Sequence, residues 1–66
     1  MNITINQVSH EIAPDSTVAD IACKFLKDNM GVVIELNGKI IAKAKWEQSQ
    51  LSENDAMEFI QFVGGG

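Results

Sequence analysis

The sequence predicts an α+β domain in which one helix covers one face of a mixed sheet of four to five strands. Three observations indicate this class. Apolar and polar residues alternate near both ends of the chain, as in half-buried strands. One segment alone has apolar residues at helical spacing, and an Asn-Gly pair between two β-rich runs predicts a hairpin. We therefore expect one domain over residues 1–63, followed by a flexible glycine tail over residues 64–66.

Residues 1–12 are expected to form an N-terminal hairpin. Polar and apolar residues alternate over residues 1–6, and after a short polar break the alternation resumes over residues 8–12. The apolar residues on the shared face are Ile3, Ile5, Val8 and Ile12. His10 falls on that face between two of them, which favours a half-buried or edge histidine over a general base.

A single helix is predicted after a break at residues 14–16. Thr17-x-x-Asp20 resembles a capping box, in which two side chains satisfy backbone N–H groups at the start of a helix. The apolar stripe of the helix comprises Val18, Ile21, Ala22, Phe25 and Leu26. Residues 29–31 are expected to end the helix. Cys23 falls on its flank, where we expect a bystander thiol.

A second hairpin is predicted in the middle of the chain. Residues 32–36 are β-rich without clean alternation, which favours a strand covered on both faces. Asn37-Gly38 follows, and this pair is the strongest short-range hairpin signal because both turn positions need a positive φ. Residues 39–42 then form the returning strand.

The remaining residues are expected to supply a connection and the last strand. Residues 44–51 are polar apart from Trp46, so we expect an irregular or short helical connection that Trp46 anchors to the core. A turn at residues 52–55 precedes the last strand, residues 57–63. The first and last strands are long and apolar, which suits the centre of the sheet.

Composition disfavours several function classes. The chain has five lysines, no arginine and a net charge of −4, which disfavours nucleic acid and favours a basic protein surface as partner. No apolar run approaches the roughly 18 residues of a membrane span, and no basic residue precedes Lys24, so we expect no membrane segment, no signal peptide and a cytoplasmic protein. One Cys and one His provide neither an internal disulfide nor a set of metal ligands. No nucleophile motif is present, so we do not expect an enzyme.

The terminal run Gly64-Gly65-Gly66 suits a chemical role at the chain end. Glycines end a strand poorly, but three of them reach about 10 Å and can thread a narrow channel of another protein. The carboxylate of Gly66 would be the reactive group, after activation by ATP to an acyl adenylate. The alternative is a frayed end or a cloning scar.

The order of elements together with these glycines resembles the β-grasp sulfur carriers, and most closely the ThiS family, over the whole chain. A second similarity is Asn37-x-x-Ile40-Ile41-Ala42-Lys43-x-x-Trp46, which resembles the family's Asn-x-x-x-Val-Pro-Arg-x-x-Trp stretch. The chain departs from the pattern at Ala42, where Pro is common, at Lys43, where Arg is common, and by the extra glycine Gly64.

This resemblance implies a β-grasp fold and a protein co-substrate rather than an enzyme. A ThiF-like adenylating enzyme would use ATP and Mg²⁺ to adenylate Gly66. A sulfur donor such as a cysteine desulfurase would then convert the end to a thiocarboxylate. A ThiG-like thiazole synthase would use that sulfur to build the thiazole ring of thiamine. The carrier itself would bind no cofactor or metal and would be a monomer when free.

By the same resemblance, the face opposite the helix docks on these partners. Alternation in the last strand directs Met57 and Phe59 toward the helix, and the residues expected to bind partners are Glu58, Ile60 and Phe62. The nearby acids Glu53 and Asp55 are expected to lie in a solvated turn, with a basic partner as the alternative.

Three other functions stay open on the sequence. A MoaD-like carrier, or a carrier for another sulfur metabolite, would use the same chemistry at Gly66 with a different acceptor. A ubiquitin-like modifier would end in an isopeptide bond to a lysine. A plain interaction module would make no use of its glycines.

Overall fold

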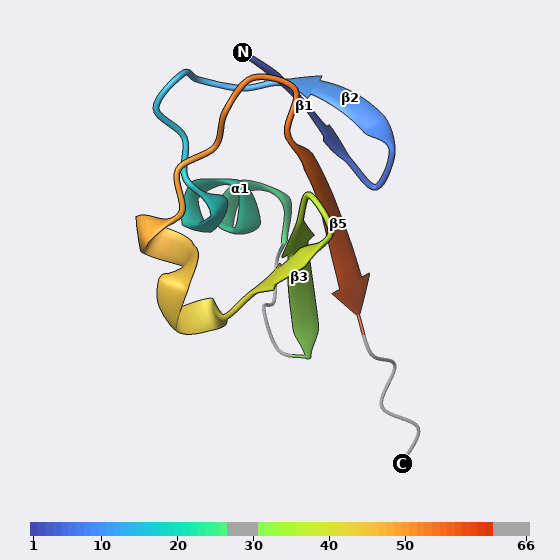
Figure 1. The fold of residues 1–66 in the computed structure, drawn as a ribbon, viewed down its shortest axis with the longest axis vertical. Coiled ribbons are helices and arrows are strands. Elements are labelled where there is room, and N and C mark those ends of the chain that lie inside the picture. Colours follow the sequence, from blue (N-terminus) through green and yellow to red (C-terminus); the bar gives the residue numbers. More distant parts are fainter. Residues whose placement is uncertain (27–30, 62–66) are drawn as a thin grey trace.

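The computed structural model describes residues 1–26 and 31–61. A mixed five-stranded sheet is covered on one face by one α-helix and a short 3₁₀ helix (Figure 1), which confirms the expected α+β class. The elements in chain order are β1 (Asn2–Ile5), β2 (Val8–Glu11), α1 (Val18–Phe25), β3 (Val32–Leu36), β4 (Lys39–Ile41), the 3₁₀ helix η1 (Lys43–Gln48) and β5 (Ala56–Gln61). No helix among the described residues is long and apolar enough to cross a membrane.

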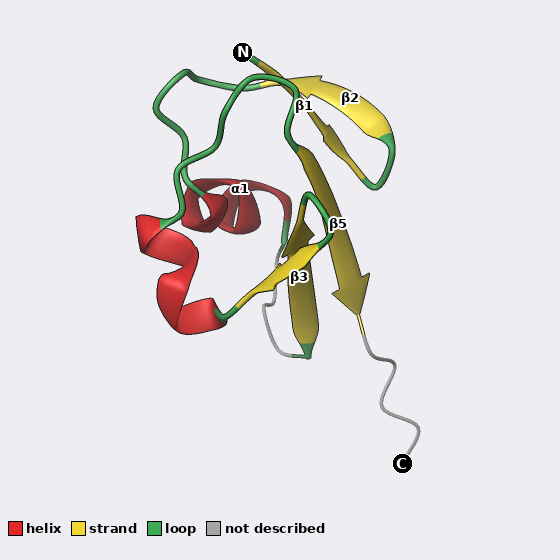
Figure 2. Ribbon diagram, viewed as in Figure 1, coloured by secondary structure: helices red, strands yellow, loops and turns green. Residues whose placement is uncertain are grey.

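The strand order is β2-β1-β5-β3-β4, so the last strand lies at the centre and the first strand lies beside it. β5 runs parallel to β1, with Ile5 opposite Met57, and antiparallel to β3, with Ile34 opposite Phe59. Figure 2 shows the two hairpins that flank this central strand. The expected central positions of the first and last strands are confirmed.

Both hairpins turn on residues with positive φ. In the second, Asn37 has φ 52° and Gly38 has φ 85°, the geometry that the Asn-Gly pair predicts. In the first, Asn6 has φ 50° and Gln7 has φ 70°. The two-residue turns set the registers, which place Ile5 opposite Val8 and Leu36 opposite Lys39.

The helix begins as the sequence predicts and ends earlier. The Thr17 hydroxyl oxygen accepts a hydrogen bond from the Asp20 N–H at 3.2 Å, and an Asp20 carboxylate oxygen accepts one from the Thr17 N–H at 2.9 Å. The expected end at residues 29–31 is wrong, because the helix ends at Phe25 and Leu26 is already extended. Phe25 was expected in the buried stripe, but it occupies the last helical position and is 39% exposed.

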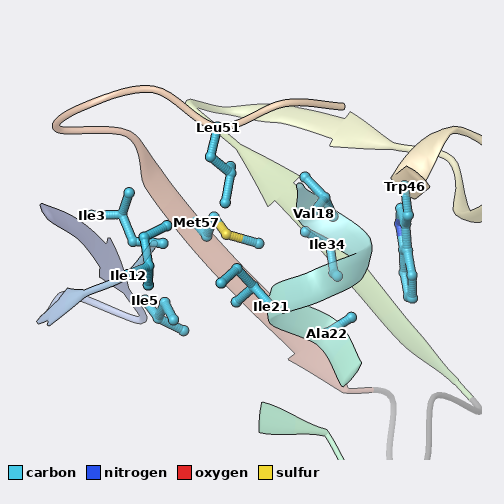
Figure 3. Close-up of a cluster of buried hydrophobic side chains, with 10 residues drawn as sticks. All are labelled: Ile3, Ile5, Ile12, Val18, Ile21, Ala22, Ile34, Trp46, Leu51 and Met57. Carbon is cyan, nitrogen blue, oxygen red and sulfur yellow. The ribbon is translucent and has the colours of Figure 1, made fainter. Parts of the chain in front are cut away.

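The core lies between the sheet, α1, η1 and the segment that precedes β5 (Figure 3). Its buried apolar residues are Ile3, Ile5, Ile12, Val18, Ile21, Ala22, Ile34, Trp46, Leu51 and Met57. Trp46 anchors η1 as expected, since its ring is buried and its Nε1–H donates to the Ile41 carbonyl at 3.0 Å. The expectation that β3 is covered on both faces is wrong. Ile34 is the one fully buried residue of this strand, because both described helices pack on the same side of the sheet.

Candidate functional site

The site that the sequence predicts begins at the end of β5. This central strand ends at Gln61, and the chain continues from there toward the glycines. Phe62, Gly64, Gly65 and Gly66 lie outside the described residues, so their roles stay predictions. What the structure describes is the strand that precedes this segment in the sequence, together with the sheet around that strand.

Alternation along β5 divides its side chains as expected. Met57 is fully buried toward α1, and Phe59 packs against the same core. Glu58 is half-buried and Ile60 is 38% exposed, and both belong to the opposite face of the sheet. We call this opposite side the outer face.

Register adds residues to the outer face that the sequence reasoning missed. Across β3, Val33 lies opposite Ile60, and Glu35 lies opposite Glu58. Across β4, Ile40 lies opposite Glu35 and is 68% exposed. Directly opposed residues of antiparallel strands share a face, so three apolar side chains and two carboxylates gather there. The two-residue turn after Leu36 could have revealed the β3–β4 pairing from the sequence alone.

The two sides of the sheet differ in where the lysines lie. In the described part of the chain, the lysines lie on the helix side: Lys24 on α1, Lys43 and Lys45 on η1, and Lys39 on β4, opposite the inward-facing Leu36. The outer face carries Glu35 and Glu58, and Glu11 lies on it at the β2 edge, opposite Asn2. The outer face is therefore both acidic and partly apolar.

The carboxylates of the turn before β5 accept hydrogen bonds from the turn itself and from neighbouring segments. Asp55 accepts hydrogen bonds from the Ser52 N–H at 2.7 Å and from Asn37 Nδ2 at 3.0 Å. Glu53 accepts one from the Asn2 N–H at 3.1 Å. These contacts favour the interpretation of Glu53 and Asp55 as residues of an exposed turn.

The other reactive side chains are not brought together. His10 is half-buried on the edge strand β2, and its ring makes an edge contact with Phe25 at 5.0 Å between centroids. Cys23 is an exposed free cysteine on α1. No group of three or more His, Cys, Asp or Glu that could hold a metal ion occurs over residues 1–26 and 31–61.

Comparison with known proteins finds similarity along nearly the whole chain. The model of the ThiS family matches residues 3–66. A sulfur carrier protein ThiS of Bacillus subtilis (strain 168) is 34% identical over 50 residues, which are 76% of each chain. A thiazole synthase of Paramagnetospirillum magneticum is 27% identical over 66 residues, which cover this whole chain and 20% of that protein.

Solved structures agree with the fold described above. The crystal structure of a thiamine biosynthesis protein (ThiS) from Geobacter metallireducens superposes with a TM-score of 0.87 at 28% identity, and covers all of both chains. A solution structure of a thiamine biosynthesis protein from the same organism gives a TM-score of 0.79 at 28% identity, and covers all of this chain and 88% of that one. The expected β-grasp fold is thereby confirmed, and the chain belongs to the ThiS family of sulfur carriers of thiamine biosynthesis.

Proposed function

We propose that this chain carries sulfur as a thiocarboxylate on Gly66 and donates it for formation of the thiazole ring. The observation that carries the proposal is the family match, which extends through the terminal glycines to residue 66. The central position of β5 supports it, because the strand that leads to the tail is held between two neighbouring strands. A rigid strand presents a short tail in a defined direction.

The chemistry requires activation, since a carboxylate is a poor electrophile. A carboxylate oxygen of Gly66 attacks the α-phosphorus of ATP, and pyrophosphate leaves with Mg²⁺ neutralising its charge. The terminal sulfur of a persulfide then attacks the acyl carbon, and AMP leaves. A thiol cleaves the remaining S–S bond, which yields the thiocarboxylate and a disulfide. All of these groups except Gly66 belong to partners.

The partners follow from these steps. We propose a ThiF-like adenylating enzyme that binds ATP and Mg²⁺, a persulfide donor such as a cysteine desulfurase, and a ThiG-like thiazole synthase. The thiazole synthase is supported by the Paramagnetospirillum protein, because one polypeptide with that name contains a segment similar to this entire chain. Such a polypeptide would hold a carrier and its acceptor enzyme together.

Docking is assigned to the outer face. Glu58 and Ile60 lie on the strand that leads to Gly66, and Ile60 is partly exposed. Gly66 lies six positions after Ile60, which is at most about 20 Å of extended chain. A partner that binds Gly66 in its active site is therefore within reach of this face, and Phe62 is proposed to contribute to the same contact.

Intact-mass measurement tests the proposal. The chain is incubated with ATP, Mg²⁺, an adenylating enzyme and a sulfur donor, and we expect the mass to rise by the exchange of one oxygen for sulfur. Deletion of Gly66 should abolish the exchange, whereas Cys23→Ser should leave it unchanged. Sulfur uptake by the shortened chain would refute the proposal and direct attention to Cys23. A protein adduct would indicate a modifier, and transfer to an acceptor other than a thiazole precursor would indicate another pathway.

A further inference from the structure

We infer that Glu35 and Glu58 together receive an arginine of the adenylating enzyme, and that this contact selects the partner for the outer face. The inference rests on the proposed function, since it assumes that such an enzyme binds the carrier. It adds the chemistry of the contact: two carboxylates around one basic side chain, with exposed apolar residues next to them.

The register brings the two carboxylates together. Glu35 on β3 lies directly opposite Glu58 on β5. Their Cβ atoms are therefore about 5 Å apart on the same face, and both residues are half-buried. Like charges in this arrangement repel each other and destabilise the pairing of the strands.

The described part of the chain offers this pair no cation on its own face. All four lysines in the described ranges lie on α1, on η1 or on the helix side of β4. The neighbours of the pair on the outer face include the apolar residues Val33, Ile40 and Ile60. The repulsion is therefore not relieved within the described residues, and a cation from a partner would relieve it.

Arginine fits this surface better than a compact cation. Its planar guanidinium can donate to two carboxylates at once, and its apolar stem can lie along an isoleucine side chain. Ile40 lies opposite Glu35 across β4, and Ile60 follows Glu58 two residues along β5; they are 68% and 38% exposed. We therefore expect the partner surface to present an arginine with apolar side chains around it.

Charge complementarity favours the adenylating enzyme as the occupant. The carrier has a net charge of −4, and its reacting group is the Gly66 carboxylate. An enzyme that brings this carboxylate to the triphosphate of ATP must place cationic groups around the meeting point of the two anions. Basic residues around the entrance of that enzyme's active site, through which Gly66 enters, would therefore be the first to contact the outer face.

This arrangement makes opposite predictions for folding and for binding. Removal of one charge from the pair should stabilise the free carrier, because the repulsion is lost. The same change should weaken the complex, because an interfacial arginine loses a charged acceptor. A residue with a purely structural role would move both quantities in the same direction.

The test compares Glu35→Gln, Glu58→Gln and the double variant with Glu47→Gln. Glu47 is exposed on η1, on the helix side, so its variant removes the same unit of charge away from the pair. Association and dissociation rates with the purified adenylating enzyme are measured at low and at physiological salt. The melting temperature of each free carrier is measured in parallel, and fluorescence of Trp46 reports that it is folded.

We expect the double variant to bind about tenfold more weakly, with a lower association rate and a flatter salt dependence. Its melting temperature should rise by about 2 °C. Glu47→Gln should change the affinity by less than about twofold. Equal binding by the double variant and the unmodified chain, or equal weakening by Glu47→Gln, would overturn the inference.

The same set of proteins separates this inference from the proposed function. The unmodified carrier is first tested for sulfur uptake at Gly66 by intact mass. Absence of uptake refutes the proposed function, whatever the affinities are. Normal uptake combined with unchanged affinity of the double variant refutes the role of the acidic pair alone.

Discussion

Asn37→Ala should destabilise the fold although it lies in an exposed turn. Asn37 is the first turn residue of the β3–β4 hairpin, with φ 52°, and it is exposed. Its Oδ1 accepts from the Ala56 N–H at 2.9 Å, and its Nδ2 donates to Asp55 Oδ1 at 3.0 Å. Its backbone N–H also donates to the Ala56 carbonyl at 2.7 Å. The side chain thus ties the hairpin to the start of β5.

The expected magnitude has two parts. A left-handed conformation costs alanine roughly 1 kcal/mol, a cost that asparagine largely escapes. Each of the two exposed side-chain hydrogen bonds contributes about 0.5 kcal/mol, the lower end of the usual range. The sum is about 2 kcal/mol, against a total stability of about 3 to 10 kcal/mol for a chain of this length. With a urea dependence of about 1 kcal/mol per molar, the midpoint should fall by about 2 M.

Urea titration followed by Trp46 fluorescence measures this loss. Trp46 is the single tryptophan of the chain and is 5% exposed, so its emission reports unfolding of the core. Asn37→Gly is the matched control, since glycine accepts the positive φ but makes neither side-chain hydrogen bond; it should lose about half as much stability. If the glycine variant were as unstable as the alanine variant, the backbone part of this reasoning would be wrong. If both matched the unmodified chain, the hydrogen bonds would contribute nothing.

Three further changes test other parts of the structure. Thr17→Ala removes one half of the capping box and should cost about 1 kcal/mol, or a fall of about 4 to 8 °C in melting temperature, whereas Thr17→Ser should stay close to the unmodified chain. Met57→Ala should lower the free energy of unfolding by about 2 to 5 kcal/mol in the same urea titration, because Met57 is fully buried on β5, the strand between β1 and β3. Met57→Leu should lower it by less than about 1.5 kcal/mol. Ile60→Asp should weaken binding to the adenylating enzyme in the rate measurements, while Val8→Asp, at an exposed apolar residue on another strand, should not; unchanged affinity of Ile60→Asp would count against docking by the outer face.

Local signals in the sequence predicted the parts of the fold that depend on neighbouring residues. The capping box at Thr17 and the turn at Asn37 each need only a few adjacent side chains, and both are present as expected. The alternation in β5 likewise separates Met57 from Ile60, because a strand has a fixed period. These predictions needed no knowledge of distant contacts.

Features that depend on tertiary packing were predicted less well. The helical pattern continues through Leu26, yet the helix ends at Phe25, where the ring makes an edge contact with His10 of the first hairpin. The partners of Glu58 and Ile60 on the outer face were also missed, since they lie on β3 and their positions follow from the β3–β5 register. That register joins segments more than twenty residues apart, and no local pattern determines it.

The two faces of the sheet differ in what they contribute to folding. Every buried apolar residue in the described part of the chain lies on the helix side, and the outer face contributes none of them. The outer face can therefore hold Glu35 opposite Glu58, a repulsion of up to about 1 kcal/mol, without disturbing the core. For the same reason, substitutions on the outer face should leave the fold intact, so their effects on binding can be interpreted directly. Under the proposed function, a small carrier benefits from this division, because its stability comes from one side of the sheet and the proposed partners would bind the other.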